Sequence, residues 1–134
     1  MLTRAAPPRT RAASWAGLLL SVATVVGLNQ GWQAWSASRL GSEVAARAAP
    51  GDIEMLATAS CVYCAQARSW FAEHKVAYTE CDIERQAACA AKFSVLVSPG
   101  TPMLLVRGQR QVGFNPERVA QALRAPTLTP TLSR

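Results

Sequence analysis

The sequence lacks the features of a nucleic-acid-binding protein. Its net charge is +6, yet it contains no run of Lys and Arg residues and no basic stripe interleaved with aromatic residues. Arg4, Arg9 and Arg11 supply half of that charge, which leaves an ordinary surface balance for the remaining chain. The composition therefore argues against nucleic acid as a partner.

The length of the chain limits the possible fold classes. Among the 134 residues, only the stretch from about Ile53 to Leu123 mixes apolar and charged residues in a regular way. About 70 residues can form one small core, but they are too few for a dinucleotide-binding fold. The sequence also contains no internal repeat, so we expect one small domain with appended segments.

Charged residues are absent from Ala12 to Ser38, and the densest apolar part runs from Trp15 to Leu28. Residues 13–32 have the length of about 20 residues that a membrane-spanning helix needs. Because the N-terminal arginines precede this run, the positive-inside rule places the N-terminus in the cytoplasm and the remaining chain outside it. The sequence therefore predicts a cytoplasmic N-terminus and a transmembrane anchor within residues 1–38.

The same segment fits two alternatives. In a cleavable signal peptide, the arginines form the n-region, residues 15–26 form the apolar h-region, and Ala34 and Ser36 lie near a cleavage site. A buried helix of a soluble protein is the other alternative. The anchor and the signal peptide agree that the following domain lies outside the cytoplasm, in the periplasm if the cell is Gram-negative.

Two further segments flank the patterned region. Residues 39–51 are small and Ala-rich and end in Pro50-Gly51, which is typical of a linker. The tail, residues 125–134, is rich in Pro and Thr and is predicted to be disordered. These limits leave residues 52–124 as the domain.

Apolar periodicity within the domain predicts an α/β layer fold with the order βαβαββα. Asn115 is a good N-cap and Pro116 a good first residue for the last helix. Gln109-Arg110 is the predicted turn of a hairpin between the last two strands. The predicted strands are 53–57, 76–81, 103–106 and 111–113, and the predicted helices are 64–74, 85–93 and 117–123.

The motif that carries chemistry is Cys61-Val62-Tyr63-Cys64, which falls between the first strand and the first helix. Unpaired N–H groups and partial positive charge at a helix N-terminus favour the thiolate, so we expect a lowered pKa for Cys61. Cys61 is the predicted nucleophile, and Cys64, one turn deeper, is predicted to resolve the mixed disulfide. His74, the only histidine, is about three turns away and is predicted to have a capping or surface role.

The four cysteines allow other arrangements. An all-thiolate zinc site usually uses two close pairs, but Cys81 and Cys89 are eight residues apart, so no metal is predicted. A purely structural Cys61–Cys64 disulfide closes too short a loop to add much stability. For Cys81 and Cys89, a structural disulfide, a second redox relay and two free thiols remain open.

A strand, the CVYC motif and a helix, followed by Thr101-Pro102 before a strand, resemble the glutaredoxin family over roughly residues 53–123. CVYC is similar to the CPYC of dithiol glutaredoxins, with Val62 in place of proline. The resemblance implies a thioredoxin-like fold, with Pro102 in the cis form beside the reactive sulfur and the backbone of Thr101 pairing with the substrate. Tyr63 and Phe114 are further candidate substrate contacts.

The implied activity is thiol–disulfide exchange. Residues 113–116 (GFNP) differ from the glutathione-using branch and are similar to the redoxins that supply ribonucleotide reductase. The resemblance implies no bound cofactor, protein thiols or disulfides as partners, and glutathione as a candidate cosubstrate. A non-catalytic binding or assembly module of the same fold and a zinc-binding module are the alternatives. The direction of electron flow depends on the partner couple.

Overall fold

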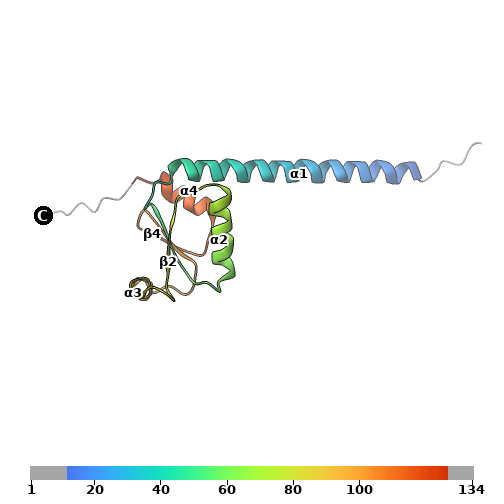
Figure 1. The fold of residues 1–134 in the computed structure, drawn as a ribbon. Coiled ribbons are helices and arrows are strands. Elements are labelled where there is room, and N and C mark those ends of the chain that lie inside the picture. Colours follow the sequence, from blue (N-terminus) through green and yellow to red (C-terminus); the bar gives the residue numbers. More distant parts are fainter. Residues whose placement is uncertain (1–11, 127–134) are drawn as a thin grey trace, which may run out of the picture. The chain divides into compact units, whose positions relative to one another are not determined.

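The computed structural model describes residues 12–126, and the chain divides into two units, Met1–Ala37 and Ser38–Arg134 (Figure 1). The first unit contains most of helix α1 (Ala12–Arg47). The second contains the end of α1 and a domain of strands and helices. The predicted functional residues all lie in the second unit.

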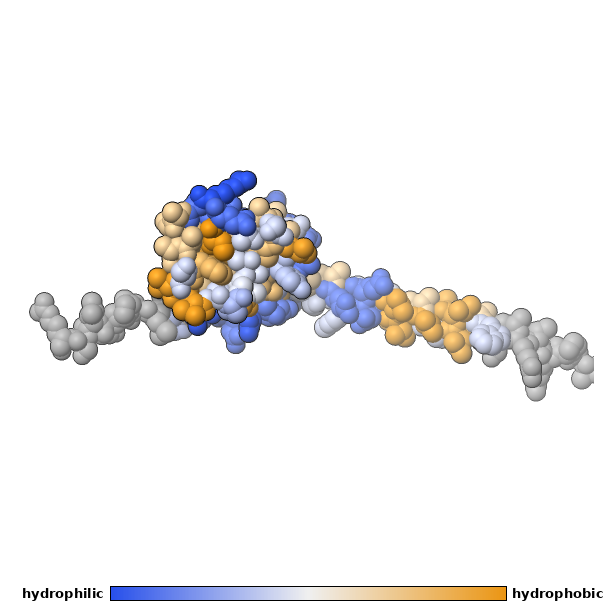
Figure 2. All heavy atoms as spheres, turned by 90° about the horizontal axis from the view of Figure 1, so that it is seen from below, coloured by the Kyte–Doolittle hydropathy of each residue, from blue (hydrophilic) through white to orange (hydrophobic). Residues whose placement is uncertain are grey.

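Large apolar side chains of α1 between Trp15 and Trp35 are exposed, and Figure 2 shows hydrophobic residues gathered over a stretch of this helix. Within residues 12–126, no helix is both long enough and apolar enough to cross a membrane, so the predicted transmembrane anchor is not supported. Ser21 and Thr24 are among the polar residues that lower the mean hydropathy of α1, and their hydroxyls bond back to carbonyls one turn earlier. The N-terminal arginines lie outside the described residues.

The segment predicted to be a linker is instead helical as far as Arg47, where α1 ends shortly before Pro50. Its Leu40 and Val44 pack into the core of the domain, and Val44 is fully buried. Glu43 accepts two hydrogen bonds of 2.6 Å from Arg124. The prediction was wrong because an Ala-rich segment with apolar residues four positions apart favours a packed helix. The compact unit therefore begins near residue 38 rather than 52.

The domain is built on a four-stranded sheet in the order β2-β1-β3-β4. The parallel pair is β1 (Ile53–Ala57) and β2 (Thr79–Asp82), connected through α2 (Val62–Glu73). β3 (Met103–Val106) runs antiparallel to β1, and β4 (Gln109–Val112) runs antiparallel to β3. The remaining helices are α3 (Ala87–Val95) and α4 (Pro116–Arg124). This is the predicted thioredoxin-like order.

The two faces of the sheet carry separate hydrophobic clusters. Because side chains alternate along a strand, Ile53 and Met55 face α2, α4 and the end of α1, whereas Leu56 faces α3. Figure 1 shows α2 and α4 close together, with α3 apart from them. The larger cluster includes Phe71 and Leu104, both fully buried. This core fixes α2 on the sheet and hence the position of the CVYC motif.

The element bounds differ from prediction mainly in two strands. β2 begins at Thr79 rather than residue 76, because the N–H of Val76 bonds to the carbonyl of Phe71 and closes the turn after α2. β4 begins at Gln109, because Arg107 and Gly108 form the hairpin turn with φ of 49° and 81°. The predicted turn at Gln109-Arg110 is therefore wrong. Residues 127–134 of the predicted tail lie outside the described residues.

Candidate active site at the start of α2

Cys61 is the N-cap residue of α2, with φ −77° and ψ 113°. In this position its Sγ accepts a hydrogen bond of 3.2 Å from the backbone N–H of Cys64. A sulfur that fills the capping position meets the N–H groups that the first helical turn leaves unpaired. The N-terminus of α2 therefore lies against the sulfur of Cys61.

The two cysteines of the CVYC motif are both free thiols but differ in exposure. Cys61 is partly exposed, whereas Cys64 is fully buried in the larger cluster. A partner sulfur can therefore reach Cys61 from solvent but cannot reach Cys64 directly. This asymmetry follows from their spacing, because Cys64 lies one helical turn further along α2.

The two thiols also differ in pKa. Partial burial raises the pKa of Cys61, but hydrogen bonds from the Cys64 and Thr101 side chains and from the N–H groups of Cys64 and Tyr63 lower it below its ordinary value. Burial raises the pKa of Cys64, and the hydrogen bond with Cys61 raises it further. Near neutral pH, Cys61 is thus the thiol more readily converted to the attacking thiolate.

The Thr101-Pro102 peptide bond is cis, the form that the resemblance implied, and it lies beside Cys61. The Sγ of Cys61 is 3.4 Å from the carbonyl oxygen of Thr101, to which the neutral thiol donates. On the other side, the carbonyl of Pro102 accepts a hydrogen bond of 2.8 Å from the N–H of Gly113. Gly113 has φ +77°, a conformation that favours glycine. The cis-proline loop is thereby held between the sulfur and the end of β4.

An ion pair stabilises the opposite side of α2. Arg68 donates to both carboxylate oxygens of Glu80 on β2, at 2.6 to 3.0 Å, and also to the carbonyl of Thr58 at 3.1 Å. Thr58 follows the last residue of β1. This contact joins α2, β2 and the loop that leads to Cys61. The guanidinium of Arg68 on α2 is therefore already engaged by Glu80 and Thr58.

An open groove of about 410 Å³ runs past the cis-proline loop. It is lined by Tyr63 and Gln66 of α2, by residues 99–102 and by residues 112–114. No charged residue contributes to this lining. Phe114 is fixed in the groove by ring contacts at 5.5 Å with Trp70 and 5.2 Å with Phe71. The groove therefore offers aromatic, aliphatic and backbone surface next to the reactive sulfur.

Residues 53–111 match the family model for glutaredoxin, and this range contains both cysteines of the CVYC motif and the cis-proline. Over these residues the chain is similar to the glutaredoxin family. The match covers less than half of the chain and leaves out α1, Gly113 and Phe114.

Solved structures give related matches. The domain is similar to a single-residue mutant of the thioredoxin-like protein BC3987, with 28% identity over 55% of this chain and 95% of that one and a TM-score of 0.50. The unmutated BC3987 is 27% identical over 52% and 97% of the two chains, with a TM-score of 0.47. The glutaredoxin grx-1 from Archaeoglobus fulgidus is 15% identical over 55% and 87%, with a TM-score of 0.46. Among curated proteins, none matches the chain.

One groove beside Cys61 is lined by all four predicted substrate residues, which are Tyr63, Thr101, Pro102 and Phe114. Sequence reasoning missed five other lining positions, which are Gln66, Pro99, Gly100, Val112 and Gly113. Gln66 had a usable signal, because it lies three residues after Tyr63 and shares its helix face. Val112 had none, because its place depends on how the β3–β4 hairpin turns.

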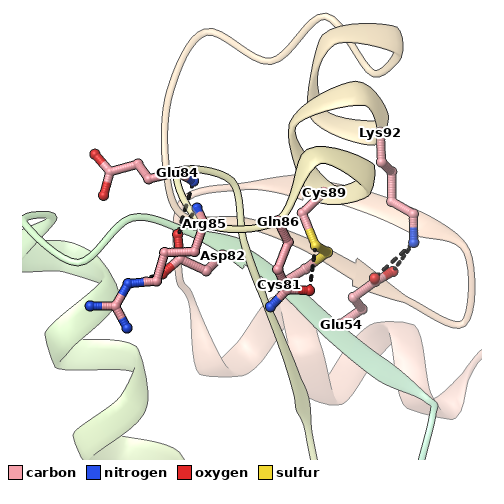
Figure 3. The surroundings of a disulfide bond; sticks show 8 residues. All are labelled: Glu54, Cys81, Asp82, Glu84, Arg85, Gln86, Cys89 and Lys92. Atoms are coloured by element: carbon pink, nitrogen blue, oxygen red, sulfur yellow. Dashed lines mark hydrogen bonds and ion pairs between the residues drawn. A yellow bond between two sulfur atoms is a disulfide. The ribbon is translucent and has the colours of Figure 1, made fainter.

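Cys81 and Cys89 form a disulfide that joins the end of β2 to α3, with their Cα atoms 5.5 Å apart. Figure 3 shows a second link beside it, in which Lys92 of α3 donates to Glu54 of β1. The disulfide belongs to the smaller cluster, on the opposite face of the sheet from Cys64. The four cysteines therefore do not come together, and no group of three or more possible metal ligands occurs in residues 12–126.

Proposed function

We propose that this glutaredoxin-family domain is a thiol–disulfide oxidoreductase, with Cys61 as the nucleophile and Cys64 as the resolving thiol. The observation that carries the proposal is the contrast between the two sulfurs. Cys61 is reachable, caps a helix and has a lowered pKa, whereas Cys64 is buried and has a raised pKa. A pair of this kind separates the attacking step from the resolving step.

In the reducing direction, the thiolate of Cys61 attacks one sulfur of a substrate disulfide. A bond forms between Cys61 and that sulfur, the substrate S–S bond breaks, and the other substrate sulfur leaves as a thiolate. Cys64 then loses its proton and attacks Cys61, which releases the second substrate thiolate and leaves a Cys61–Cys64 disulfide. Two electrons pass to the substrate, and a reduced dithiol partner restores the pair. The same steps in reverse oxidise a dithiol substrate, and the potentials of the partners decide the direction.

The cis-proline loop and the aromatic groove position the substrate in this proposal. The Thr101 backbone lies close enough to Cys61 to pair with the residue that carries the substrate sulfur. Tyr63 and Phe114 supply rings on either side of the groove. No metal or bound organic group takes part in these steps, because both electrons travel through sulfur.

Trapping tests the proposal. In a Cys64→Ser variant, attack by Cys61 still occurs but resolution cannot, so a mixed disulfide with the partner should accumulate and disappear on treatment with a reductant. The matched control is the double variant Cys61→Ser/Cys64→Ser, which retains the Cys81–Cys89 disulfide but should trap nothing. Equal trapping by both variants, or none by Cys64→Ser with model disulfides, would show that Cys61 is not a nucleophile and favour a non-catalytic binding module.

We also propose that the domain works outside the cytoplasm. Two observations support this. The Cys81–Cys89 pair forms a disulfide, and structural disulfides are typical of oxidising compartments and rare in cytosolic proteins. An arginine-containing N-terminus followed by an uncharged apolar segment is typical of an export signal. A reporter enzyme that is active only after export, fused after residue 126, should be active in cells. An inactive reporter, together with free Cys81 and Cys89 thiols in extracts, would contradict the assignment.

A further inference from the structure

The active-site groove is poorly suited to a small anionic disulfide. Glutathione carries two carboxylates, but no charged residue lines the groove. The nearest arginine on α2, Arg68, is already paired with Glu80 and with the carbonyl of Thr58. A short anionic ligand would therefore exchange water for uncharged surface without gaining an ion pair. The groove instead fits the uncharged residues that flank a cysteine in a polypeptide.

A second groove, of about 520 Å³, adjoins the first. It lies between β4 and α4, and Val112 belongs to the lining of both grooves. Because the strand order is β2-β1-β3-β4, β4 is an edge strand of the sheet. A polypeptide whose cysteine lies against Cys61 can therefore continue over Val112 and along this edge in an extended conformation.

The second groove differs from the first in charge. Arg110 and Arg118 contribute to its lining, together with the amide side chains of Gln111 and Gln121, and no acidic residue does. Arg118 has no ion-pair partner within residues 12–126, and Arg110 donates to an uncharged acceptor, the carbonyl of Leu96. Two guanidinium groups without carboxylate partners at an exposed edge attract acidic side chains.

Gln111 supplies a further observation at the floor of this groove. Its Nε2 donates to the carbonyl of Arg118 at 3.0 Å. Its Oε1 is buried and is the only side-chain N or O atom in the described part of the chain that is buried without a hydrogen-bond partner. Because this oxygen is buried, a polypeptide in the groove does not contact it, and the amide of Gln111 instead links β4 to α4 through its Nε2.

We propose that the two grooves form one substrate surface, and that the substrates are polypeptide disulfides with an acidic segment close to the reacting cysteine rather than glutathione disulfide. This inference rests on the proposed oxidoreductase function and names its substrate class. The first groove holds the uncharged residues around the cysteine. The second binds the acidic segment through Arg110 and Arg118. Because the substrate continues past Val112 into the second groove, it extends beyond the residues that directly flank its cysteine.

The test compares peptides of one length that contain a single disulfide and end in two Glu, two Gln or two Lys residues on either side of the cysteine. The wild-type protein should reduce the Glu peptide with a kcat/KM about fivefold above that of the Gln peptide, through KM, and less so at high salt. Arg118→Gln should remove this preference, and Arg118→Glu should favour the Lys peptide. The matched control is Arg85→Gln, because Arg85 lies beyond the opposite edge strand, is exposed and contacts neither groove.

The outcomes separate this inference from the proposed function. If the wild-type protein reduces neither the peptides nor a small uncharged disulfide such as hydroxyethyl disulfide, the oxidoreductase function itself fails. If it reduces all peptides equally, or glutathione disulfide faster than the Glu peptide at equal concentration, the oxidoreductase stands and the acidic-substrate inference is overturned. Far-UV circular dichroism shows whether each Arg118 variant is folded, and the salt dependence of the wild type tests the charge effect without any substitution.

Discussion

Replacement of Gly41 by alanine tests whether the end of α1 packs on α2. A Cβ atom at position 41 would lie 2.1 Å from Nδ1 and 2.3 Å from Cγ of His74, so the imidazole would have to move. His74 is the C-cap of α2, and its ring centre lies 4.5 Å from that of Trp70. Alanine at this position therefore either separates the two helices or displaces a packed ring.

Two effects of opposite sign set the magnitude. Alanine is favoured over glycine inside a helix by about 1 kcal/mol. Overpacking a tight contact costs about 1–3 kcal/mol, and loss of the contact between His74 and Trp70 costs about 0.5–1.5 kcal/mol more. We therefore expect Gly41→Ala to lower the free energy of unfolding by about 2 kcal/mol. In a His74→Ala background the obstacle is absent, and the same substitution should raise it by up to about 1 kcal/mol.

Urea unfolding followed by circular dichroism measures all four proteins of this double-mutant cycle. Gly31→Ala is the matched control in the same helix, because nothing lies within 4 Å of a Cβ built there, so it should not destabilise the protein. If Gly41→Ala is as stable as the wild type while His74 is present, residues 38–47 do not pack on α2 as described. The cycle also concerns the active site, because Trp70 contacts Phe114, which lines the groove.

Two further predictions concern the cysteines. The pH at which Cys61 reaches half of its maximal alkylation rate should be below that of an unperturbed thiol. This pH should rise in Cys64→Ala but rise less in Cys64→Ser, because a serine hydroxyl can still donate to the Cys61 sulfur. Equal profiles in all three proteins would rule out this hydrogen bond as a cause of the lowered pKa. Replacement of both Cys81 and Cys89 by alanine should lower the free energy of unfolding by about 2–3 kcal/mol without slowing reduction of a model disulfide by Cys61, and a loss of turnover greater than the loss of folded protein would instead favour a second redox relay.

The parts of the fold that sequence predicted well are those fixed by local patterns. β1 and β3 have their predicted bounds, because each is a short apolar run that begins directly after Gly51-Asp52 or Pro102. Asn115 caps α4 as predicted, with its side chain accepting from the N–H of Arg118 at 2.8 Å. The CVYC motif lies at the start of α2, as predicted, because Cys61 caps the helix through its own neighbours in the sequence. Each of these features depends on a few neighbouring residues.

The parts that sequence missed depend on contacts between distant residues. Arg107 adopts φ +49° in the hairpin turn, and its guanidinium donates to Asp52 and to the carbonyls of Arg47 and Leu123. Nothing near Arg107 in the sequence indicates these three partners. The end of α1 is a different case, because its local pattern favours a helix, but the burial of Leu40 and Val44 depends on contacts with the distant core of the domain. The second groove has the same origin, because only the hairpin turn brings Val112 to both grooves.

The relation between the two active-site sulfurs changes during the proposed reaction. In the reduced domain, the hydrogen bond and the charge of Cys61 both raise the pKa of Cys64, in addition to its burial. Once Cys61 has entered a mixed disulfide, it carries no negative charge, and the electrostatic part of this effect disappears. Cys64 then ionises more readily than before, at the stage at which its thiolate is needed. Burial keeps Cys64 away from external disulfides, and the state of Cys61 determines when it reacts, so the order of the two steps follows from one helical turn of separation.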